Sequence, residues 1–359
     1  MPAMPHIVVA ALATEEFPRH SEGTIVELAD GSLLLVWQEF WRGDQGHLDS
    51  DFWPARLMAM TSHDGGLTWG GKRLLAMPEG DQVSCYSPSL LRLPDGSLLL
   101  GFMRYHSISP IASTGEVWLS CDEGRTFFPQ GRGWEQRPFG PTNNVIKRLA
   151  SGRLLWPLSA PAPDAQSVAD PWVNGVVYSD DGGVTWREGD NWVALPMRGA
   201  MEPHVEELRD GRVLMNMRTQ LGAVFHSWSE DGGVTWSKPQ TSGLRSPESC
   251  PELLRIPQTG DLLVVWNNAP YDPGYCSHFG RRTPLTVAIS EDEGQTWGHI
   301  HDLETDPGRA FSNPAGNFTR QGTAVFSYWT SEYLPSGAMC DAPIDLRVAV
   351  VDLDWLYDD

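Results

Sequence analysis

Hydrophobic residues along the chain gather in short runs that come in pairs, and a turn containing glycine separates each pair. Within a run, apolar positions either alternate with polar ones or continue without interruption, as in VELADGSLLLVW at 26–37. The turns lie at Asp30-Gly31, Asp95-Gly96, Gly152, Asp210-Gly211, Gly260 and Gly322. Short apolar runs joined by Asp-Gly or similar turns are typical of β-hairpins. The pattern predicts six hairpins, and no sustained helical period stands out.

A second motif, S-x-D-x-G-x-T-W, alternates with these hairpins. It occurs five times, starting at Ser62, Ser120, Ser179, Ser229 and Ser290, with Phe127 once in place of Trp. An Asp in such a turn accepts backbone N–H bonds, and Gly provides the positive φ that a tight reversal needs. The Trp is suited to packing between sheets. We therefore expect these Asp and Trp residues to stabilise the fold, and none of them is a catalytic candidate.

Six hairpins at a period of about 58 residues give each unit enough strand for one four-stranded antiparallel sheet. Radial repetition of such sheets predicts an all-β, six-bladed β-propeller that occupies 1–359 as a single domain. The last unit lacks the turn motif. We expect the C-terminal run LRVAVVDLDWLY and the N-terminal run HIVVAAL to complete it, because such closure leaves no open sheet edge.

Composition and charge narrow the classes of partner. The 359 residues include 46 Asp plus Glu and 26 Lys plus Arg, a formal charge of −20. This excess of acid argues against nucleic acid or an anionic membrane as the partner, since both attract basic surfaces. Five cysteines without a C-x-x-C pair indicate reduced thiols. We expect no metal, no cofactor and no membrane span, and a cytoplasmic location; the oligomeric state stays open.

The turn motif is the Asp-box, and the chain resembles the sialidase superfamily over nearly its whole length. Segments such as RHSEGTIVEL at 19–28, EPHVEELRDGR at 202–212 and RTPLTVAISEDEGQTW at 282–297 resemble a sialidase-like subgroup whose substrates are assigned by similarity. The resemblance implies three arginines that clamp a substrate carboxylate, an Asp acid/base and a Tyr–Glu pair. Guanidinium forks suit a carboxylate, and Tyr is the known exception among glycosidase nucleophiles.

Carried over to this sequence, the resemblance gives candidates for each role except the nucleophile. The arginines are Arg19, Arg218 and Arg282, with the neighbouring Arg281 as second choice for the third. Glu202 corresponds to the Glu of the nucleophile pair. Asp51 is the first choice for the acid/base and Asp49 the second, in a loop that also contains Asp44. The position of the Tyr nucleophile is occupied by Phe311, which cannot act as a nucleophile.

Further polar residues fall at the same ends of the predicted blades, where propeller loops form binding sites. Glu22, Tyr105 and Asn144 are the candidates for substrate binding. His204 follows Glu202 by two residues, so strand alternation predicts that both face the same side and suit acid/base chemistry. The remaining members of this group are His20, His106, Asn143, Glu248, Asn267 and Asn268.

These candidates support three hypotheses. The first is an exo-glycosidase that hydrolyses a terminal acidic sugar, either sialic acid or a related 2-keto or uronic acid. With Phe311 at the Tyr position, an inverting route through a carboxylate that activates water is also available. The second is a non-catalytic carbohydrate-binding propeller. The third is a uronate polysaccharide lyase that uses His204 or a tyrosine as its base.

Overall fold

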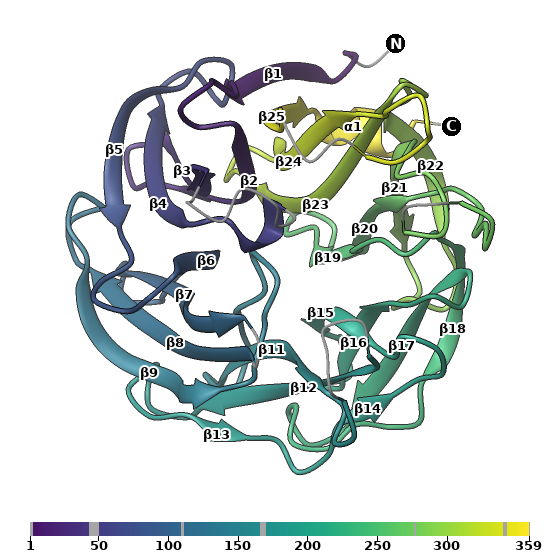
Figure 1. Cartoon of the computed structure of the whole chain (residues 1–359), viewed down its shortest axis with the longest axis horizontal. Coiled ribbons are helices and arrows are strands. Elements are labelled where there is room, and N and C mark those ends of the chain that lie inside the picture. The colour runs from purple at the N-terminus through teal and green to yellow at the C-terminus, as the bar shows by residue number, and fades with distance from the viewer. Residues whose placement is uncertain are drawn as a thin grey trace.

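Six sheets follow one another around a central axis, and β2, β6, β15, β19 and β23 are among the strands nearest to that axis (Figure 1). The computed structural model describes residues 3–42, 50–108, 111–165, 170–275, 278–339 and 343–358. Blade 1 contains β2 (Arg19–Glu27), β3 (Leu33–Phe40), β4 (Ala55–Ser62) and β5 (Gly70–Ala76). Blade 2 contains β6 (Ser84–Arg92), β7 (Leu98–Ile108), β8 (Ile111–Ser120) and β9 (Phe128–Arg137).

The other blades repeat this antiparallel plan. Blade 3 contains β10 (Lys147–Arg148), β11 (Leu154–Pro161), β12 (Trp172–Ser179), β13 (Arg187–Glu188) and β14 (Val193–Ala194), the last two both paired with β12. Blade 4 contains β15 (Met201–Glu207), β16 (Val213–Arg218), β17 (Ala223–Ser229) and β18 (Gln240–Arg245). Blade 5 contains β19 (Glu252–Arg255), β20 (Leu262–Asn267), β21 (Leu285–Ser290) and β22 (Gly298–Glu304). The predicted six-bladed β-propeller is confirmed.

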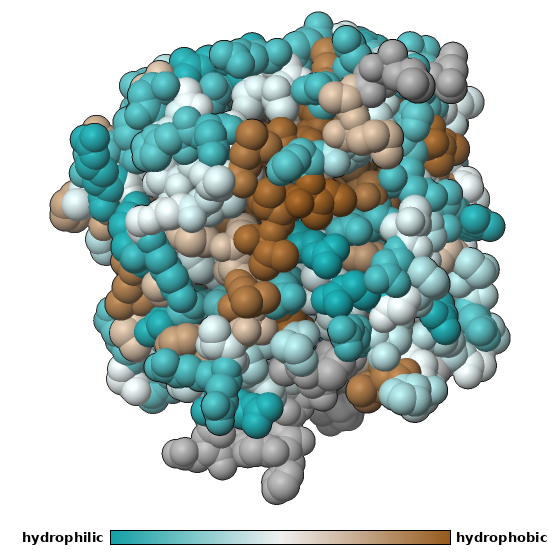
Figure 2. Space-filling view, turned by 90° about the horizontal axis from the view of Figure 1, so that it is seen from above, coloured by the Kyte–Doolittle hydropathy of each residue, from teal (hydrophilic) through white to brown (hydrophobic). Residues whose placement is uncertain are grey.

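Blade 6 joins the two ends of the chain. Its strands are β23 (Arg309–Phe318), β24 (Ala324–Glu332), β25 (Asp345–Val351) and, outermost, β1 (His6–Ala11). His6 pairs with Val350, so both predicted terminal runs complete this blade. β1 is the outer edge of the ring there, and Figure 2 shows apolar residues gathered on this side of the molecule. Val9 in β1 is 48% exposed.

The Asp-box turns have the geometry that the motif predicts. In the first box, Asp64 accepts hydrogen bonds from the backbone N and the hydroxyl of Thr68 at 2.9 and 2.6 Å. Ser62 Oγ donates to the same carboxylate and accepts from Gly66 N, both at 2.8 Å. Gly66 has φ of 99°, which a side chain would disfavour. These bonds lower the pKa of Asp64 to about 2, which fits a structural role.

The aromatic residue of each Asp-box packs into an apolar cluster shared with a neighbouring blade. Trp69 lies against Leu346 and Val348 of blade 6, and Phe127 belongs to the cluster between blades 1 and 2. The other three are Trp186, Trp236 and Trp297. The boxes therefore hold adjacent blades together, as expected.

The inner strands share an irregularity that positions the site. Pairing slips between Ser21 and Thr24 in β2, between Tyr86 and Ser89 in β6, between Met201 and His204 in β15, and between Ser312 and Ala315 in β23. Within these bulges Glu22, Ser87, Glu202 and Asn313 have φ of 46°, 51°, 47° and 49°. Non-glycine residues with positive φ cluster at functional sites, and bulges redirect side chains. The bulges thus lie at one end of the central channel.

Apart from these strands, the described chain contains one 3-10 turn, η1 (Ser50–Phe52), and one short helix, α1 (Leu353–Leu356). No helix among the described residues has the length and apolar character needed to cross a bilayer. Within the same ranges, no group of three or more His, Cys, Asp or Glu side chains is arranged to hold a metal ion.

Candidate active site

Arg19, the first residue of β2, is buried and held at the mouth of the channel by several partners. Its Nη1 donates to Ser50 Oγ at 2.8 Å and to the Asp51 carboxylate. Its Nη2 donates to Glu22 Oε1 at 3.4 Å. The guanidinium lies 4.5 Å from the ring centroid of Phe40. The η1 turn therefore brings Asp51 to Arg19, and two carboxylates share one guanidinium.

Arg218, at the end of β16, links two further carboxylates. Nη1 donates to Glu202 Oε2 and Nη2 to Glu248 Oε1, both at 2.9 Å. Glu248 also accepts from Arg198 at 2.6 Å and from Gln220 at 3.0 Å. Burial works against the charged form, but Arg218 and Arg198 outweigh it and lower the pKa of Glu248 to about 2. Glu248 is therefore an ionised anchor for two arginines.

Arg282 precedes β21 and differs from the other two arginines in its partners. Its Nη1 donates to Ser312 Oγ at 2.8 Å and its Nη2 to the backbone oxygen of Glu248 at 3.1 Å. No carboxylate among the described residues pairs with it. Burial, followed by the charge of Arg218, lowers the pKa of Arg282 to about 10. Among the described residues Arg282 is thus a buried cation without an ion-pair contact, although the charges of Glu202 and Glu248 act on it and partly offset the fall in its pKa.

The neighbouring Arg281 lies outside this group. Its Nη1 donates to the backbone oxygen of Pro307 at 2.6 Å, and its guanidinium lies over the rings of Tyr333 and Tyr275 at 5.2 and 5.8 Å. Of the adjacent pair, the structure brings Arg282 and not Arg281 to the other arginines.

The three arginines act on a common space. Partial desolvation beside the arginines opposes ionisation of Asp51, but the charges of Arg19, Arg282 and Arg218 together lower the pKa of this carboxyl. These arginines belong to blades 1, 5 and 4 in turn. The Asp51 side chain is 55% exposed, whereas the side chain of Arg19 is only 4% exposed. Asp51 therefore lies at the exposed edge of the site, beside the buried arginines. Asp49 and Asp44 lie outside the described residues.

Glu22 is the most buried carboxylate that touches Arg19. Ser21 Oγ donates to it, and the residue is 5% exposed. Burial raises the pKa of Glu22 to about 7, although the charge of Arg19 acts in the opposite direction. The charges of Asp51 and Glu202 raise it further. Asp51 and Glu22 thus contact the same guanidinium, but the pKa of Asp51 is lowered and that of Glu22 is raised.

Two tyrosines of blade 2 border the same space. The rings of Tyr86 and Tyr105 pack edge to face with centroids 5.3 Å apart. Burial, and then the charge of Asp51, raise the pKa of both phenols. Glu22 acts in the same direction on Tyr86. The charge of Asp51 thus acts on both phenols, and Arg19 acts on Tyr86 in the opposite direction.

Asn144 and His204 lie further along the channel. Strand alternation predicted that His204 faces the same side as Glu202, and the structure differs from this prediction. The bulge between Met201 and His204 separates His204 from Glu202. His204 is fully buried, with Nδ1 at 2.8 Å from Glu252 Oε2 and Nε2 at 3.5 Å from Cys250 Sγ. Asn144 donates to Glu252 Oε1 at 2.9 Å. The expectation that His204 faces the same side as Glu202 was therefore wrong.

Phe311 does not face the arginines either. It is fully buried, and its ring packs against Tyr328 at 6.1 Å and under the guanidinium of Arg347 at 5.9 Å. The next residue, Ser312, meets Arg282 instead. The chain therefore places a hydroxyl of serine, and no phenol from residue 311, against the third arginine.

Sequence reasoning missed several members of the site. Arg198, Tyr86 and Ser312 were not proposed for it, and Glu248 was named only as a polar residue at a blade end. Their common signal is position, because Tyr86, Glu248 and Ser312 lie at or just before the start of an inner strand. Blade-end position alone does not separate them from ordinary turn residues.

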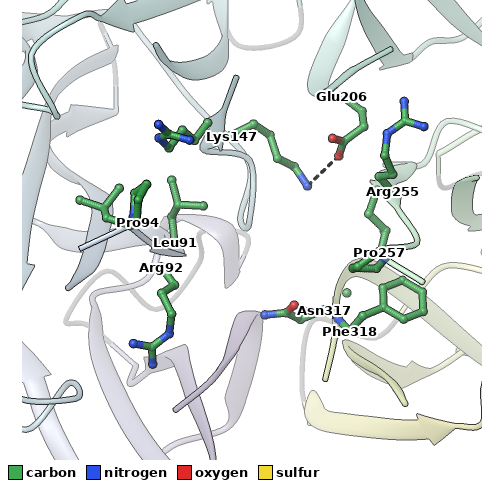
Figure 3. Close-up of a pocket in the computed structure, with 13 residues that line it drawn as sticks. Leu91, Arg92, Pro94, Lys147, Glu206, Arg255, Pro257, Asn317 and Phe318 are labelled. Atoms are coloured by element: carbon green, nitrogen blue, oxygen red, sulfur yellow. Dashed lines mark hydrogen bonds and ion pairs between the residues drawn. The ribbon is translucent and has the colours of Figure 1, made fainter. Parts of the chain in front are cut away.

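The opposite mouth of the channel is a different environment. A cavity of about 400 Å³ lies there, lined by the other ends of the inner strands (Figure 3). Lys147 Nζ lies 3.3 Å from Glu206 Oε2 inside it. Arg92 and Arg255 at its margin pair with Glu123 and Glu293. The cations at this mouth are mostly neutralised, in contrast to Arg282.

Comparison with known proteins agrees with this architecture. The model of the BNR repeat-like domain matches residues 24–326. The chain belongs to this family. A sialidase of Micromonospora viridifaciens is 24% identical over 97% of this chain and 54% of its own length. The chain thus spans about half the length of that relative. Together with the six-bladed fold, these relationships support membership of the sialidase superfamily.

Two solved structures resemble the whole chain. A protein of unknown function from Dyadobacter fermentans has a TM-score of 0.73 at 19% identity, with 98% of both chains covered. An α-L-arabinanase of Penicillium chrysogenum complexed with arabinobiose has a TM-score of 0.66 at 17% identity, with 99% of both chains covered. The fold is therefore shared by proteins with different names, and the substrate has to be argued from the side chains.

Proposed function

We propose that this protein is a sialidase-like exo-glycosidase that hydrolyses a terminal acidic sugar, either sialic acid or a related 2-keto or uronic acid. The observation that supports this most is the convergence of Arg19, Arg218 and Arg282 from three blades on the space beside Asp51. Three buried guanidinium groups in a chain of charge −20 are a local exception that suits an anionic ligand.

The arginines still have hydrogen-bonding capacity for such a ligand. The Nε atoms of Arg218 and Arg282 are buried and have no hydrogen-bond partner among the described residues. Buried donors without a partner are unfavourable, and a carboxylate that accepts from them relieves this. Arg282 in addition lacks a carboxylate partner, so it is the first group to which a substrate carboxylate binds. Arg19 and Arg218 orient the sugar from the other sides.

The chemistry in this proposal is direct displacement by water. The ring of Phe311 is buried away from the arginines and offers no nucleophile. Asp51, at the exposed rim, protonates the leaving oxygen, and Glu202, 25% exposed beside Arg218, activates the water. This division of roles between two carboxyl groups is the inverting mechanism of glycosidases.

The test is hydrolysis of aryl glycosides of N-acetylneuraminate, Kdo and D-glucuronate, with Arg282→Met as the matched inactive variant. We expect the wild type to release the aryl group from one of the three and the variant to lose at least a hundredfold in kcat/KM. Proton NMR of the first-formed sugar should show inverted configuration. Equal background rates for both proteins on all three substrates would refute the proposal.

A glycan-binding propeller without turnover is the second candidate, because residue 311 carries no hydroxyl. It predicts that the free sugar acid binds in calorimetry while no aryl group is released. Lyase action would appear as an ultraviolet-absorbing unsaturated product. His204 is unsuited to act as the lyase base, because it is fully buried against Glu252 and Cys250.

A further inference from the structure

The charged groups at the arginine mouth balance one another before any ligand binds. Each carboxylate there contacts at least one arginine: Asp51 and Glu22 contact Arg19, Glu202 contacts Arg218, and Glu248 contacts Arg218 and Arg198. Arg282 is the fourth cation. Within the part of the chain that the structure describes, four guanidinium groups therefore face four carboxyl groups. A carboxylate ligand adds a fifth negative charge to a buried cluster, which is unfavourable unless one carboxyl is neutralised.

We infer that a carboxylate ligand enters this site together with a proton, and that Glu22 is the residue that takes the proton up. The inference rests on the proposed function, because it requires the ligand at the arginines to be an acid. It adds a specificity-determining residue that is separate from the three arginines. Glu22 would make the affinity for acidic sugars depend on pH.

Glu22 makes the longest contact with an arginine among the four carboxylates, although Ser21 Oγ also donates to it. Arg19 donates to it at 3.4 Å, whereas the same guanidinium makes a closer contact with Asp51 through Nη1. By comparison, Glu202 and Glu248 each lie 2.9 Å from Arg218. A neutral carboxyl at Glu22 therefore gives up less attraction than a neutral carboxyl at any other position in the cluster.

Solvent also does little to stabilise the charge of the Glu22 carboxylate, because the side chain is buried. Its side chain is 6% exposed, and its backbone is fixed by the bulge of β2 with φ of 46°. The titratable and charged groups that face it are Arg19 on β2, Asp51 on η1, Tyr86 on β6 and Glu202 on β15. Two of these four, Asp51 and Glu202, carry negative charge and raise the pKa of Glu22, whereas the Tyr86 phenol is neutral because its own pKa is raised. A buried carboxyl in such surroundings accepts a proton readily, consistent with its raised pKa of about 7.

Proton linkage gives the direction and the size of the change in ligand affinity with pH. With a pKa of about 7 in the free protein, Glu22 is ionised above that pH and protonated below it. If only the protonated form tolerates the ligand, binding takes up about half a proton at pH 7 and about nine-tenths at pH 8. The dissociation constant should then rise roughly fiftyfold between pH 7 and pH 9.

The experiment is titration calorimetry of the full chain with three probes, N-acetylneuraminate, Kdo and D-glucuronate. Each titration is run at pH 8 in phosphate and in Tris, whose ionisation enthalpies differ, so the proton count comes from the buffer dependence. The variant is Glu22→Gln, which keeps the size of the side chain but cannot take up a proton. The matched control is Glu27→Gln on the same strand, where Glu27 pairs with Arg320 at the opposite mouth.

The inference expects close to one proton per bound ligand for the wild type and for Glu27→Gln. For Glu22→Gln it expects no buffer dependence and an affinity that is flat between pH 7 and pH 9. Wild-type binding without proton uptake would overturn the inference and leave the proposed hydrolysis intact. Uptake that persists in Glu22→Gln would overturn it as well, and so would failure of all three acids to bind. Proton uptake on binding without release of the aryl group would support the inference about Glu22 and refute the proposed hydrolysis.

Discussion

Replacement of Arg282 by methionine should leave the protein nearly as stable as the wild type, although this residue is buried at the centre of the arginine cluster. Burial and Arg218 lower the pKa of Arg282 to about 10 from the usual 12.5. Each tenfold change in an ionisation constant corresponds to about 1.4 kcal/mol, so keeping Arg282 charged in the fold costs roughly 3 kcal/mol. Methionine removes this cost together with the charge.

Two hydrogen bonds are lost in exchange, those to Ser312 Oγ and to the backbone oxygen of Glu248. At about 1 to 1.5 kcal/mol each, they offset most of the gain. The free energy of unfolding should therefore change by no more than about 1 kcal/mol. Arg218→Met is the contrasting variant, because it leaves Glu202 and Glu248 without their shared partner and should destabilise by about 3 kcal/mol or more.

Thermal unfolding and urea titration at pH 7 distinguish the two variants. A chain of 359 residues has an unfolding entropy of roughly 0.75 kcal/mol/K, so 3 kcal/mol lowers the melting temperature by about 4 °C. We expect Arg282→Met within about 1 °C of the wild type and Arg218→Met at least 4 °C below it. Equal destabilisation of both variants would refute the view that Arg282 is an uncompensated cation.

Three further predictions concern acid stability, blade contacts and the nucleophile position. Glu248 has a pKa of about 2 in the fold against 4.5 normally, so its stabilisation is present above pH 4.5 and is lost as the pH falls toward 2. The unfolding free energy from urea titration should accordingly fall less for Glu248→Gln than for the wild type between pH 5 and pH 2.5, by about 2 kcal/mol. Gly131→Ala should lower the unfolding free energy by about 1 to 3 kcal/mol, because its Cβ would lie 2.5 Å from the backbone oxygen of Val184. Gly298→Ala, with open space around its Cβ, should not destabilise in the same melt. Phe311→Tyr should lose about 1 to 3 kcal/mol by burying a hydroxyl, and a gain of glycosidase activity in that variant would contradict the orientation described above.

The regular parts of this fold were predictable because each is encoded locally. A hairpin needs only an apolar run, a turn and a second run, and an Asp-box needs only its own eight residues. Arg19, Arg218 and Arg282 were proposed because the resemblance implies three arginines and each of these stands beside a recognisable strand. Six repeats then determine the ring without any knowledge of individual contacts.

The bulges were not predictable, and one of them accounts for the error about His204. Strand alternation placed His204 beside Glu202, but the slip between Met201 and His204 breaks that alternation. Phe311 stood at the expected nucleophile position, yet its ring packs in the core and Ser312 meets the arginine. Such a slip depends on how an inner strand meets the next blade, and this information is spread over distant residues. The roles of Arg198 and Glu248 depend on the same arrangement.

The closure of the ring by β1 has a consequence for synthesis of the chain. His6 pairs with Val350, so the first strand leaves the ribosome long before its partner exists. At about 5 to 20 residues per second, that delay is roughly 20 to 70 seconds. During this time the segment IVVAA is an apolar strand with free N–H and C=O groups, which can pair with other nascent chains. The strand that seals the mature ring is therefore the segment most in need of protection while the ring is being made.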